Sequence, residues 1–239
     1  MARLTYDTTR SHPDATRISV IIPTLNEETH LSGTLKRAGN CGNVQTIVVD
    51  GGSSDRTREE ARAHCAVVIE APMGRARQMN VGAQYASGEY LIFLHADTLL
   101  PENWAESVRQ ALKKTEVLGG AFSLRIDGHF FGLRIVEALA NLRSHRFSMP
   151  YGDQAIFVRA MDFRELGGFP DIPIMEDFEF MRRLGRRGRV HILTERVVTS
   201  CRRWKTLGIL RTTAINQAVI LGYYLGVSPA RLARFYRRS

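Results

Sequence analysis

Residues 18–28 read ISVIIPTLNEE, in which an apolar, β-branched run is closed by Pro23 and followed by polar residues. A short apolar run with such a boundary predicts a buried strand over residues 18–22. The polar segment after it predicts a loop and then a helix over about residues 27–38. A buried strand that leads into a helix is the repeating unit of α/β folds.

The same order of strand and helix continues as far as about residue 94. Apolar runs predict a second buried strand over residues 46–50 and further strands over 66–70 and 90–94. The segments between them predict helices over about residues 56–65 and 76–86. Strands that are joined by helical crossovers form a mainly parallel sheet with helices on both faces. The expected fold class is therefore α/β, a three-layer α/β/α sandwich with a mainly parallel central sheet.

The second half of the chain alternates less regularly. Its patterns predict helices over about residues 101–114, 131–142 and 176–185, and mostly helix over 206–239. They predict strands over residues 119–126, 155–158 and 190–199, and a loop over 167–170.

The composition is that of a globular protein. The chain has 239 residues, of which 44% are hydrophobic and 24% charged, so we expect one large domain. Its three cysteines (Cys41, Cys65 and Cys201) are far apart, which argues against a disulfide framework or a cysteine zinc site and favours a reducing, cytoplasmic location. The first 17 residues hold no apolar segment and predict a flexible lead-in, not a signal peptide.

Positive charge is concentrated at the C-terminal end. Residues 182–239 hold 14 Lys and Arg against one acid, Glu195, or +13. The remaining 181 residues hold 19 bases and 23 acids, or −4. Such an end suits either a solvated face or a surface for anionic lipid or phosphate. Nucleic acid is not expected as a partner, because aromatic and basic residues are not interleaved.

Polar side chains follow the carboxyl ends of three predicted strands. Thr24 and Glu27 follow the first strand, Asp50 ends the second, and Asp97 follows the fourth. Each residue alone could cap a turn or a helix. Because ligands of parallel sheets bind beyond the carboxyl ends of the strands, three such ends together predict a shared site.

Five segments in this order resemble one family of enzymes. They are ISVIIPTLNEE (18–28), VVDGGSSDRT (48–57), NVGAQYASGEYLIFLHADT (80–98), GGF (167–169) and MEDFEFMRRLGRRG (175–188). Together they resemble family 2 of the inverting glycosyltransferases, which have the GT-A fold, over about residues 17–204. The segment SCRRW (200–204) is similar to a small bacterial transferase branch.

The resemblance implies a division of one domain into three parts. Residues of about 17–100 would bind the nucleotide sugar, about 101–205 the acceptor, and about 206–239 would form basic C-terminal helices. On the donor side, the resemblance implies nucleotide contacts from six residues: Pro23, Thr24, Glu27, Asp50, Arg77 and Ala96. Arg75 is the alternative to Arg77, since the Gly-Arg-Ala-Arg segment before a helix allows either register.

The resemblance also implies a metal ligand and a catalytic base. His95-Ala96-Asp97 corresponds to the acidic metal-binding motif with its first carboxylate replaced, so Asp97 would hold Mg or Mn on the donor diphosphate. Asp177 would deprotonate the acceptor hydroxyl, and Glu176 would orient the acceptor or the start of the helix. The acceptor itself would contact five residues: Gly167, Gly168, Phe169, Arg203 and Trp204.

The expected activity is thus metal-dependent transfer of a sugar, with inversion, from a UDP- or GDP-linked donor to a hydroxyl acceptor, for which a lipid-linked acceptor is one option. A nucleotidyltransferase of related fold is an alternative, although the Gly-rich basic loop of that class is missing after the first strand. A non-catalytic lipid-binding protein is another alternative. It predicts the loss of Asp97 or Asp177, and both are present.

The basic C-terminal end contains an apolar segment, TAINQAVILGYYLGV, over residues 213–227. A spanning helix needs about 20 apolar residues, so this segment is too short to cross a bilayer. Arginines on both sides of it suit a helix that lies on an anionic membrane surface, which would place the protein on the inner face of the cell membrane. Packing on the core and a homodimer interface are the alternatives, and the sequence leaves all three open.

Overall fold

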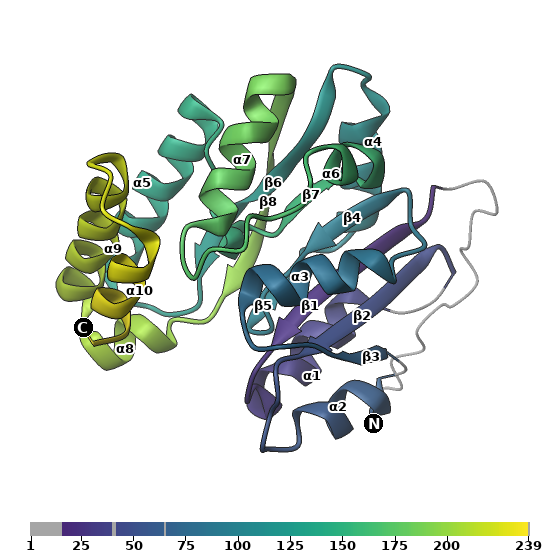
Figure 1. Ribbon diagram of the computed structural model, residues 1–239, viewed down its shortest axis with the longest axis horizontal. Helices are drawn as coiled ribbons and strands as arrows, with labels where there is room; N and C mark the ends of the chain where they lie inside the picture. The colour runs from purple at the N-terminus through teal and green to yellow at the C-terminus, as the bar shows by residue number, and fades with distance from the viewer. Residues whose placement is uncertain (1–15, 40–41, 65, 239) are drawn as a thin grey trace.

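The computed structural model describes residues 16–39, 42–64 and 66–238. The expected lead-in before residue 16 and two of the cysteines, Cys41 and Cys65, lie outside these residues. The described chain has an α/β fold in which one curled sheet runs through the whole molecule, with helices on both of its faces (Figure 1). The fold class predicted from the sequence is confirmed.

The first half forms the predicted alternation of strands and helices. Its elements are β1 (Ile18–Thr24), α1 (Glu28–Ala38), β2 (Val44–Asp50), α2 (Thr57–Ala63), β3 (Val67–Glu70), α3 (Arg75–Gln84) and β4 (Tyr90–Phe93). Strand β1 lies between β2 and β4 and is parallel to both. The register places Thr24 opposite Asp50, so the first two strands end at the same edge of the sheet.

The second half contains the predicted elements and several others. Its elements are β5 (Thr98–Leu99), α4 (Trp104–Lys113), β6 (Val117–Ile126), α5 (Phe131–Phe147), a 3-10 turn η1 (Gly152–Gln154), β7 (Ile156–Arg159), α6 (Ala160–Glu165), α7 (Glu176–Arg187), β8 (Arg189–Thr199), α8 (Arg202–Leu207), α9 (Ile209–Tyr224) and α10 (Pro229–Arg238). The sequence did not predict β5, η1 or α6. The C-terminal helical segment divides at Gly208 and Gly226, whose φ angles of 82° and 81° favour glycine.

The sheet is mixed, with the strand order β3-β2-β1-β4-β7-β6-β8-β5. The pairs β1–β2, β1–β4, β2–β3 and β6–β8 are parallel. Strand β7 is antiparallel to both of its neighbours, and β5 is antiparallel to β8. Strand β7 thereby joins the parallel N-terminal part of the sheet to the β6–β8 pair.

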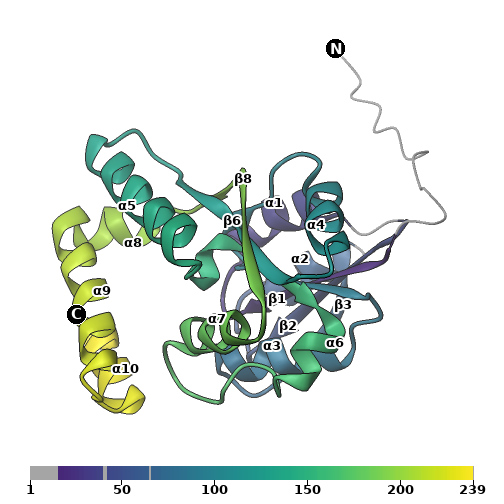
Figure 2. The same ribbon diagram turned by 90° about the horizontal axis from the view of Figure 1, so that it is seen from above.

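The core lies in two layers, one on each side of the sheet. Helices α1, α4 and α5 pack on one face, where the largest buried side chains include Phe122 and Phe157. Helices α3, α6 and α7 pack on the other, around Phe180 (Figure 2). This three-layer arrangement leaves the carboxyl ends of β1, β2 and β4 open at one edge.

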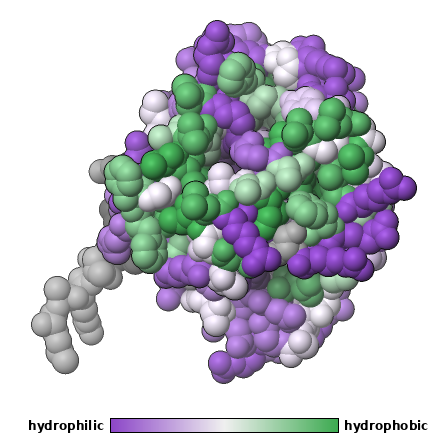
Figure 3. All heavy atoms as spheres, turned by 90° about the vertical axis from the view of Figure 1, so that its left-hand side faces the viewer, coloured by the Kyte–Doolittle hydropathy of each residue, from purple (hydrophilic) through white to green (hydrophobic). Residues whose placement is uncertain are grey.

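The C-terminal helices form a third, smaller cluster at the side of the molecule. Val219 of α9 and Leu232 of α10 pack against Phe178 and Met175 at the start of α7. Helices α5, α8, α9 and α10 together form one side of the protein, which Figure 3 views directly. The described helices are all too short or too polar to cross a membrane.

Candidate active site

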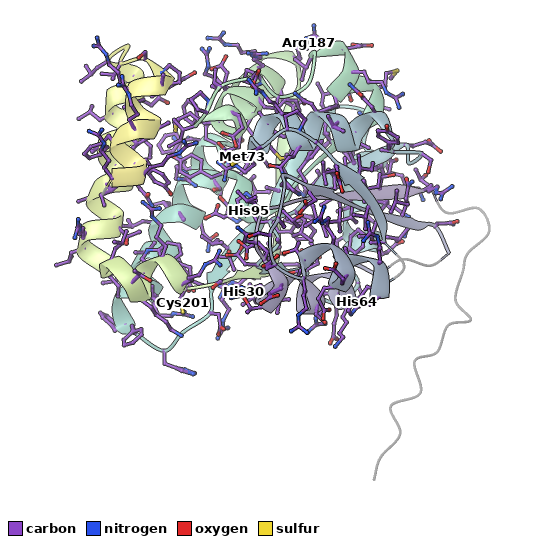
Figure 4. The ribbon with its side chains drawn as sticks, turned by 60° about the horizontal axis from the view of Figure 1, so that its bottom comes forward. His30, His64, Met73, His95, Arg187 and Cys201 are labelled. Atoms are coloured by element: carbon purple, nitrogen blue, oxygen red, sulfur yellow. The ribbon has the colours of Figure 1, made fainter. Side chains whose placement is uncertain are left out.

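A cleft opens where β1 and β4 end. Its volume is about 1070 Å³, and its walls come from the loop after β1, the start of α3, the segment after β4, the loop before α7, and helices α8 and α10. A second cavity of about 470 Å³ adjoins it and shares Arg75, His95, Asp97 and Arg202 as lining residues. Figure 4 shows His95 between the sheet and the C-terminal helices, where the two cavities meet.

The start of α7 carries the two predicted catalytic carboxylates into these cavities. Asp177 lines the smaller cavity, and its Oδ2 accepts a hydrogen bond of 2.6 Å from the backbone N–H of Gly152. The backbone N–H of Phe178 donates to its Oδ1 at 2.8 Å. Two backbone donors from different elements therefore fix the orientation of this carboxylate.

Glu176 is buried and lines the larger cleft. Its Oε1 accepts a hydrogen bond from Nε of Arg75. Burial raises the pKa of Glu176, and the positive charge of Arg75 opposes that rise. Glu176 thus holds an arginine at the junction of the two cavities and does not itself project freely into either.

Arg75 and His95 lie against each other in this junction. Arg75 Nη1 is 3.4 Å from His95 Nε2. Burial and the nearby guanidinium lower the pKa of His95 to about 3, so its imidazole is neutral at physiological pH. A neutral ring at this position adds no positive charge of its own beside Arg75.

Asp97 lines both cavities and faces a second acidic residue. Arg202 Nη2 lies 2.8 Å from Glu27 Oε1 and 3.7 Å from Asp97 Oδ2. Burial and the charge of Glu27 raise the pKa of Asp97. Carboxylates gathered at the rim of a cleft attract cations, and here an arginine side chain satisfies that attraction.

These residues fit a divalent metal of the expected kind. Within the described residues, no cluster of three or more His, Cys, Asp or Glu forms a complete metal cage. Mg²⁺ is usually bound by one or two carboxylates together with substrate phosphates and waters, so a complete protein cage is not required. Asp97, with Glu27 beside it, supplies the donor set that such a site needs.

The predicted nucleotide contacts divide between the cleft wall and the structure behind it. Lining residues include Pro23, Thr24, Glu27, Arg77 and Ala96.

Asp50 is fully buried. Its Oδ2 accepts hydrogen bonds from the backbone N–H groups of Gly52 and Ser53, at 3.0 and 2.9 Å. In this structure its carboxylate orders the loop after β2, and a contact between Asp50 and a nucleobase stays a prediction.

Arg75 and Arg77, the two candidates for a phosphate contact, have different partners in the structure. Arg77 forms an exposed ion pair of 2.8 Å with Asp171, in the loop that precedes α7. Arg75 instead reaches Glu176 and His95 at the junction of the cavities. Arg75 therefore lies where the two cavities meet and Arg77 lines the larger cleft, and a contact between Arg77 and a nucleotide stays a prediction.

The predicted acceptor residues lie in two different places. Arg203 and Trp204 line the smaller cavity, with the Arg203 guanidinium 3.8 Å from the ring centre of Tyr236. Phe169 differs from the prediction because it is buried in the core, where its ring lies 4.7 Å from the rings of Phe93 and Phe180.

The turn Gly167-Gly168 has positive φ angles at both glycines and delivers Phe169 into this core position. The backbone of Phe169 is held by Asn80 of α3, at 2.8 and 2.9 Å. The cleft wall here is formed by the next residues, 171–174. The GGF segment thus supports the wall from behind.

Sequence reasoning missed several residues of the site. Arg202 lies in the SCRRW segment, which does not by itself indicate a role for this residue at the site. Nothing in the sequence around Asp153 indicates a site residue. Asp153 lines the smaller cavity, and burial raises its pKa to about 6, with the charge of Asp177 adding to the rise and Arg143 opposing it. Its Oδ1 is buried without a hydrogen-bond partner among the residues that the structure describes.

A family model confirms the resemblance that the sequence motifs indicated. Residues 19–162 match the model "Glycosyl transferase family 2", so the chain belongs to that family. The match covers β1 to α6 and ends before the Glu176-Asp177 pair.

Two curated relatives are similar to parts of the chain. The 4,4'-diaponeurosporenoate glycosyltransferase of Staphylococcus haemolyticus is 33% identical over 126 residues, which cover 48% of this chain and 34% of that protein. A PGL/p-HBAD biosynthesis glycosyltransferase of Mycobacterium bovis is 35% identical over 97 residues, covering 37% of this chain and 38% of the relative. The matched parts thus span little more than a third of either relative.

Solved structures share the fold at low sequence identity. S. aureus TarS 1-349 superposes with a TM-score of 0.60 at 17% identity, covering 77% of this chain and 60% of that one. The same protein solved in complex with UDP-GlcNAc gives a TM-score of 0.58 at 16% identity, with coverage of 77% and 58%. The fold of the chain is therefore that of the GT-A glycosyltransferases.

Proposed function

We propose that this protein transfers a sugar from a UDP-linked donor to a hydroxyl acceptor, with inversion at the anomeric carbon. The observation that carries the proposal is that Asp97 and Asp177 both line the smaller of two joined cavities at the open edge of the sheet, and that Asp97 also lines the larger one. Such a pair serves the two needs of the reaction, which are a site for the diphosphate and a base for the acceptor. TarS, which shares the fold, has been solved with UDP and with UDP-GlcNAc.

The donor belongs in the larger cleft. The loop after β1 lies on one wall, and the first turn of α3 lies on another with its backbone N–H groups and Arg75, which suit an anionic diphosphate. Mg²⁺ or Mn²⁺ held by Asp97 would neutralise the charge that develops on the leaving diphosphate. Arg202 would then turn from Asp97 and Glu27 toward the phosphate oxygens.

Asp177 is the base in this proposal. Its carboxylate accepts the proton of the acceptor hydroxyl while the hydroxyl oxygen forms a bond to the anomeric carbon and the nucleoside diphosphate leaves. The hydrogen bonds from Gly152 and Phe178 hold the carboxylate in one orientation before the acceptor arrives. Glu176 positions Arg75 and thereby acts on the donor side.

The acceptor belongs in the smaller cavity, whose walls combine charged and polar groups with apolar and aromatic side chains. Around Asp177 they include Tyr151, Met175, Trp204, Val219 and Ile220. A wall of this kind favours an acceptor with an apolar portion, such as a lipid-linked hydroxyl. One curated relative is named a diaponeurosporenoate glycosyltransferase, and that acceptor has an apolar portion.

A lipid-linked acceptor would require the protein to work at a membrane surface from the cytoplasmic side. The C-terminal helices suit this location, because α9 exposes Leu221 and Tyr224 while arginines flank it on both sides. We therefore keep peripheral membrane association, and not a homodimer, as part of the proposed function.

Two substitutions separate the proposed roles. Asp177→Asn should lower transfer at least a hundredfold while leaving donor binding within about twofold, because it removes the base and no nucleotide contact. Asp97→Ala should instead abolish the part of donor binding that depends on metal. Asp127→Asn, at the exposed position that follows β6, is the matched control and should behave as the wild type.

The measurements are thermal shifts with a panel of nucleotide sugars, with and without Mn²⁺, followed by transfer or donor hydrolysis with the stabilising sugar. A bound donor raises the unfolding temperature by mass action. Near wild-type turnover by Asp177→Asn would show that another group is the base. No stabilisation by any nucleotide sugar in the presence of Mn²⁺ would reject the proposed activity.

A further inference from the structure

Helix α5 presents an apolar face to solvent in addition to the side that packs on the core. Phe131, Ile135, Leu139 and Leu142 are 78%, 49%, 58% and 63% exposed. Their spacing of four, four and three residues places them on one side of the helix. These four residues are called the α5 apolar face below.

The opposite side of α5 is buried and mixed in character, because Leu133, Val136 and Ala140 pack on the core while polar side chains beside them bind strand β6. Asn141 Oδ1 accepts a hydrogen bond of 2.7 Å from the backbone N–H of Leu124, and its Nδ2 donates to the Leu124 carbonyl at 2.9 Å. Glu137, also buried, accepts a hydrogen bond from the backbone N–H of Ile126. These contacts join the helix to strand β6 through backbone groups of the strand.

The sheet topology explains why polar residues share the buried side of α5. Strand β7 pairs with β6 at Gly119 and Gly120, and α5 then lies beside the later part of β6. Backbone groups on that edge of β6 need partners, and buried groups of this kind are costly to leave unpaired. Helix α5 supplies them from its buried side, and the α5 apolar face lies on the opposite, exposed side.

An exposed apolar stripe of this size indicates a surface that interacts with another protein or with a membrane. It continues beyond α5, because α9 exposes Leu221 and Tyr224, the residue after it exposes the side chain of Leu225, and α10 exposes Phe235. Helix α5 packs closely against α9 at Gly132, where the absence of a side chain leaves room for Ile209 of α9. In Figure 3, apolar side chains spread across the middle of this side, with hydrophilic side chains above and below them.

We propose that the α5 apolar face is a membrane-docking surface and that its occupant is a bilayer that contains anionic lipid. Charge decides between a bilayer and a second copy of the chain. Residues 202–238, which form α8 to α10 beside the α5 apolar face, contain eight Lys and Arg and no acid. Two copies joined through this side would bring like charges together, whereas anionic headgroups neutralise them.

The depth of insertion follows from the same observations. The described helices cannot cross a bilayer, so α5 lies along the interface with its apolar face in the acyl boundary. The basic residues of α8 to α10 that lie outside the two cavities then meet the headgroups; they are Lys205, Arg211, Arg231, Arg234 and Arg238. This inference concerns the surface and holds whichever sugar or acceptor the protein uses.

The test uses vesicles of phosphatidylglycerol and phosphatidylcholine in equal parts, with vesicles of phosphatidylcholine alone for comparison. The variant combines Ile135→Gln, Leu139→Gln and Leu142→Gln, which change exposed positions to a residue of similar helix propensity. The matched control combines Tyr85→Gln and Met161→Gln, which remove comparably exposed apolar side chains at the end of α3 and on α6.

We expect the full-length wild-type protein and the control to co-sediment with anionic vesicles, and added salt to weaken that binding. The triple variant should bind about a hundredfold more weakly, since it withdraws three apolar side chains from the acyl boundary. Its circular dichroism and unfolding temperature should match the control, which shows that the fold is intact.

Three results would overturn the proposal. The first is wild-type binding by the triple variant, and the second is a wild-type protein that stays in the supernatant at low salt. The third comes from light scattering without vesicles. A wild-type dimer that becomes a monomer in the triple variant, together with no vesicle binding, would assign the face to a second copy of the chain.

Discussion

Replacing Asp153 with asparagine should stabilise the folded protein at neutral and alkaline pH. Asp153 lies in the turn η1 beside the smaller cavity, and burial raises the pKa of its carboxyl to about 6. One of its oxygens is buried without a hydrogen-bond partner within the described part of the chain. An ionised carboxylate is therefore poorly solvated at this position, and asparagine keeps the shape of the side chain without the charge.

The size and pH range of the effect follow from the pKa. An ordinary aspartate has a pKa of 3.8, and Asp153 has a pKa of about 6 in the folded protein. At about 1.4 kcal/mol per pKa unit, this difference destabilises the wild type by at most about 3 kcal/mol above pH 6. The folded state binds more protons between these two values, so the wild-type penalty vanishes as the pH falls from about 6 to about 4.

Urea unfolding at a series of pH values, without donor or metal, measures this difference directly. The free energy of unfolding of Asp153→Asn minus that of the wild type should be largest near pH 8 and should shrink by most of its value near pH 4. Asp171→Asn is the opposing control, since its exposed ion pair with Arg77 lowers the pKa of Asp171. A difference for Asp153→Asn that is independent of pH, or a variant less stable than wild type at pH 8, would refute the reasoning.

Two glycines allow further tests of the site and the fold. Gly152→Ala should lower kcat at least tenfold with little change in donor KM, because the new Cβ would lie 3.0 Å from both Asp177 Oδ2 and His95 Nε2; unchanged steady-state kinetics would contradict the role given to this turn. Gly120→Ala should destabilise the protein by about 3 kcal/mol or more, because its Cβ would lie 1.8 Å from the carbonyl oxygen of His191 on the neighbouring strand; an unfolding temperature equal to that of the wild type would show that the strands can separate at no cost.

The elements that the sequence predicted well are those whose signal is local. Strands β1, β2 and β4 are short apolar runs with clear boundaries, and all are buried as expected. Strand β5 has two residues and pairs with β8, a hundred residues further along the chain. Nothing in its own sequence could indicate that pairing, because it depends on the tertiary fold.

The site shows the same division. Asp97 and Asp177 were found because each lies in a segment that resembles the family. Arg202 contacts Glu27 across 175 residues of sequence, and only the folded chain brings the two together. The sequence around Phe169 is as consistent with a core position as with a binding site, because an aromatic residue follows two glycines. Its apolar side chain favours the core position that the structure shows.

Strand β7 connects the catalytic turn with the orientation of α5. The turn η1 immediately precedes β7, and its residue Gln154 donates to the Phe122 carbonyl of β6 at 2.9 Å. The same side chain accepts a hydrogen bond of 2.7 Å from Ser144 on the buried side of α5. That turn also provides the Gly152 N–H that holds Asp177. The buried side of α5 therefore braces the turn that orients the proposed base. Rotating the helix to bury the α5 apolar face would remove that brace and take Leu133 out of the core, which gives the fold a physical reason to keep the α5 apolar face exposed.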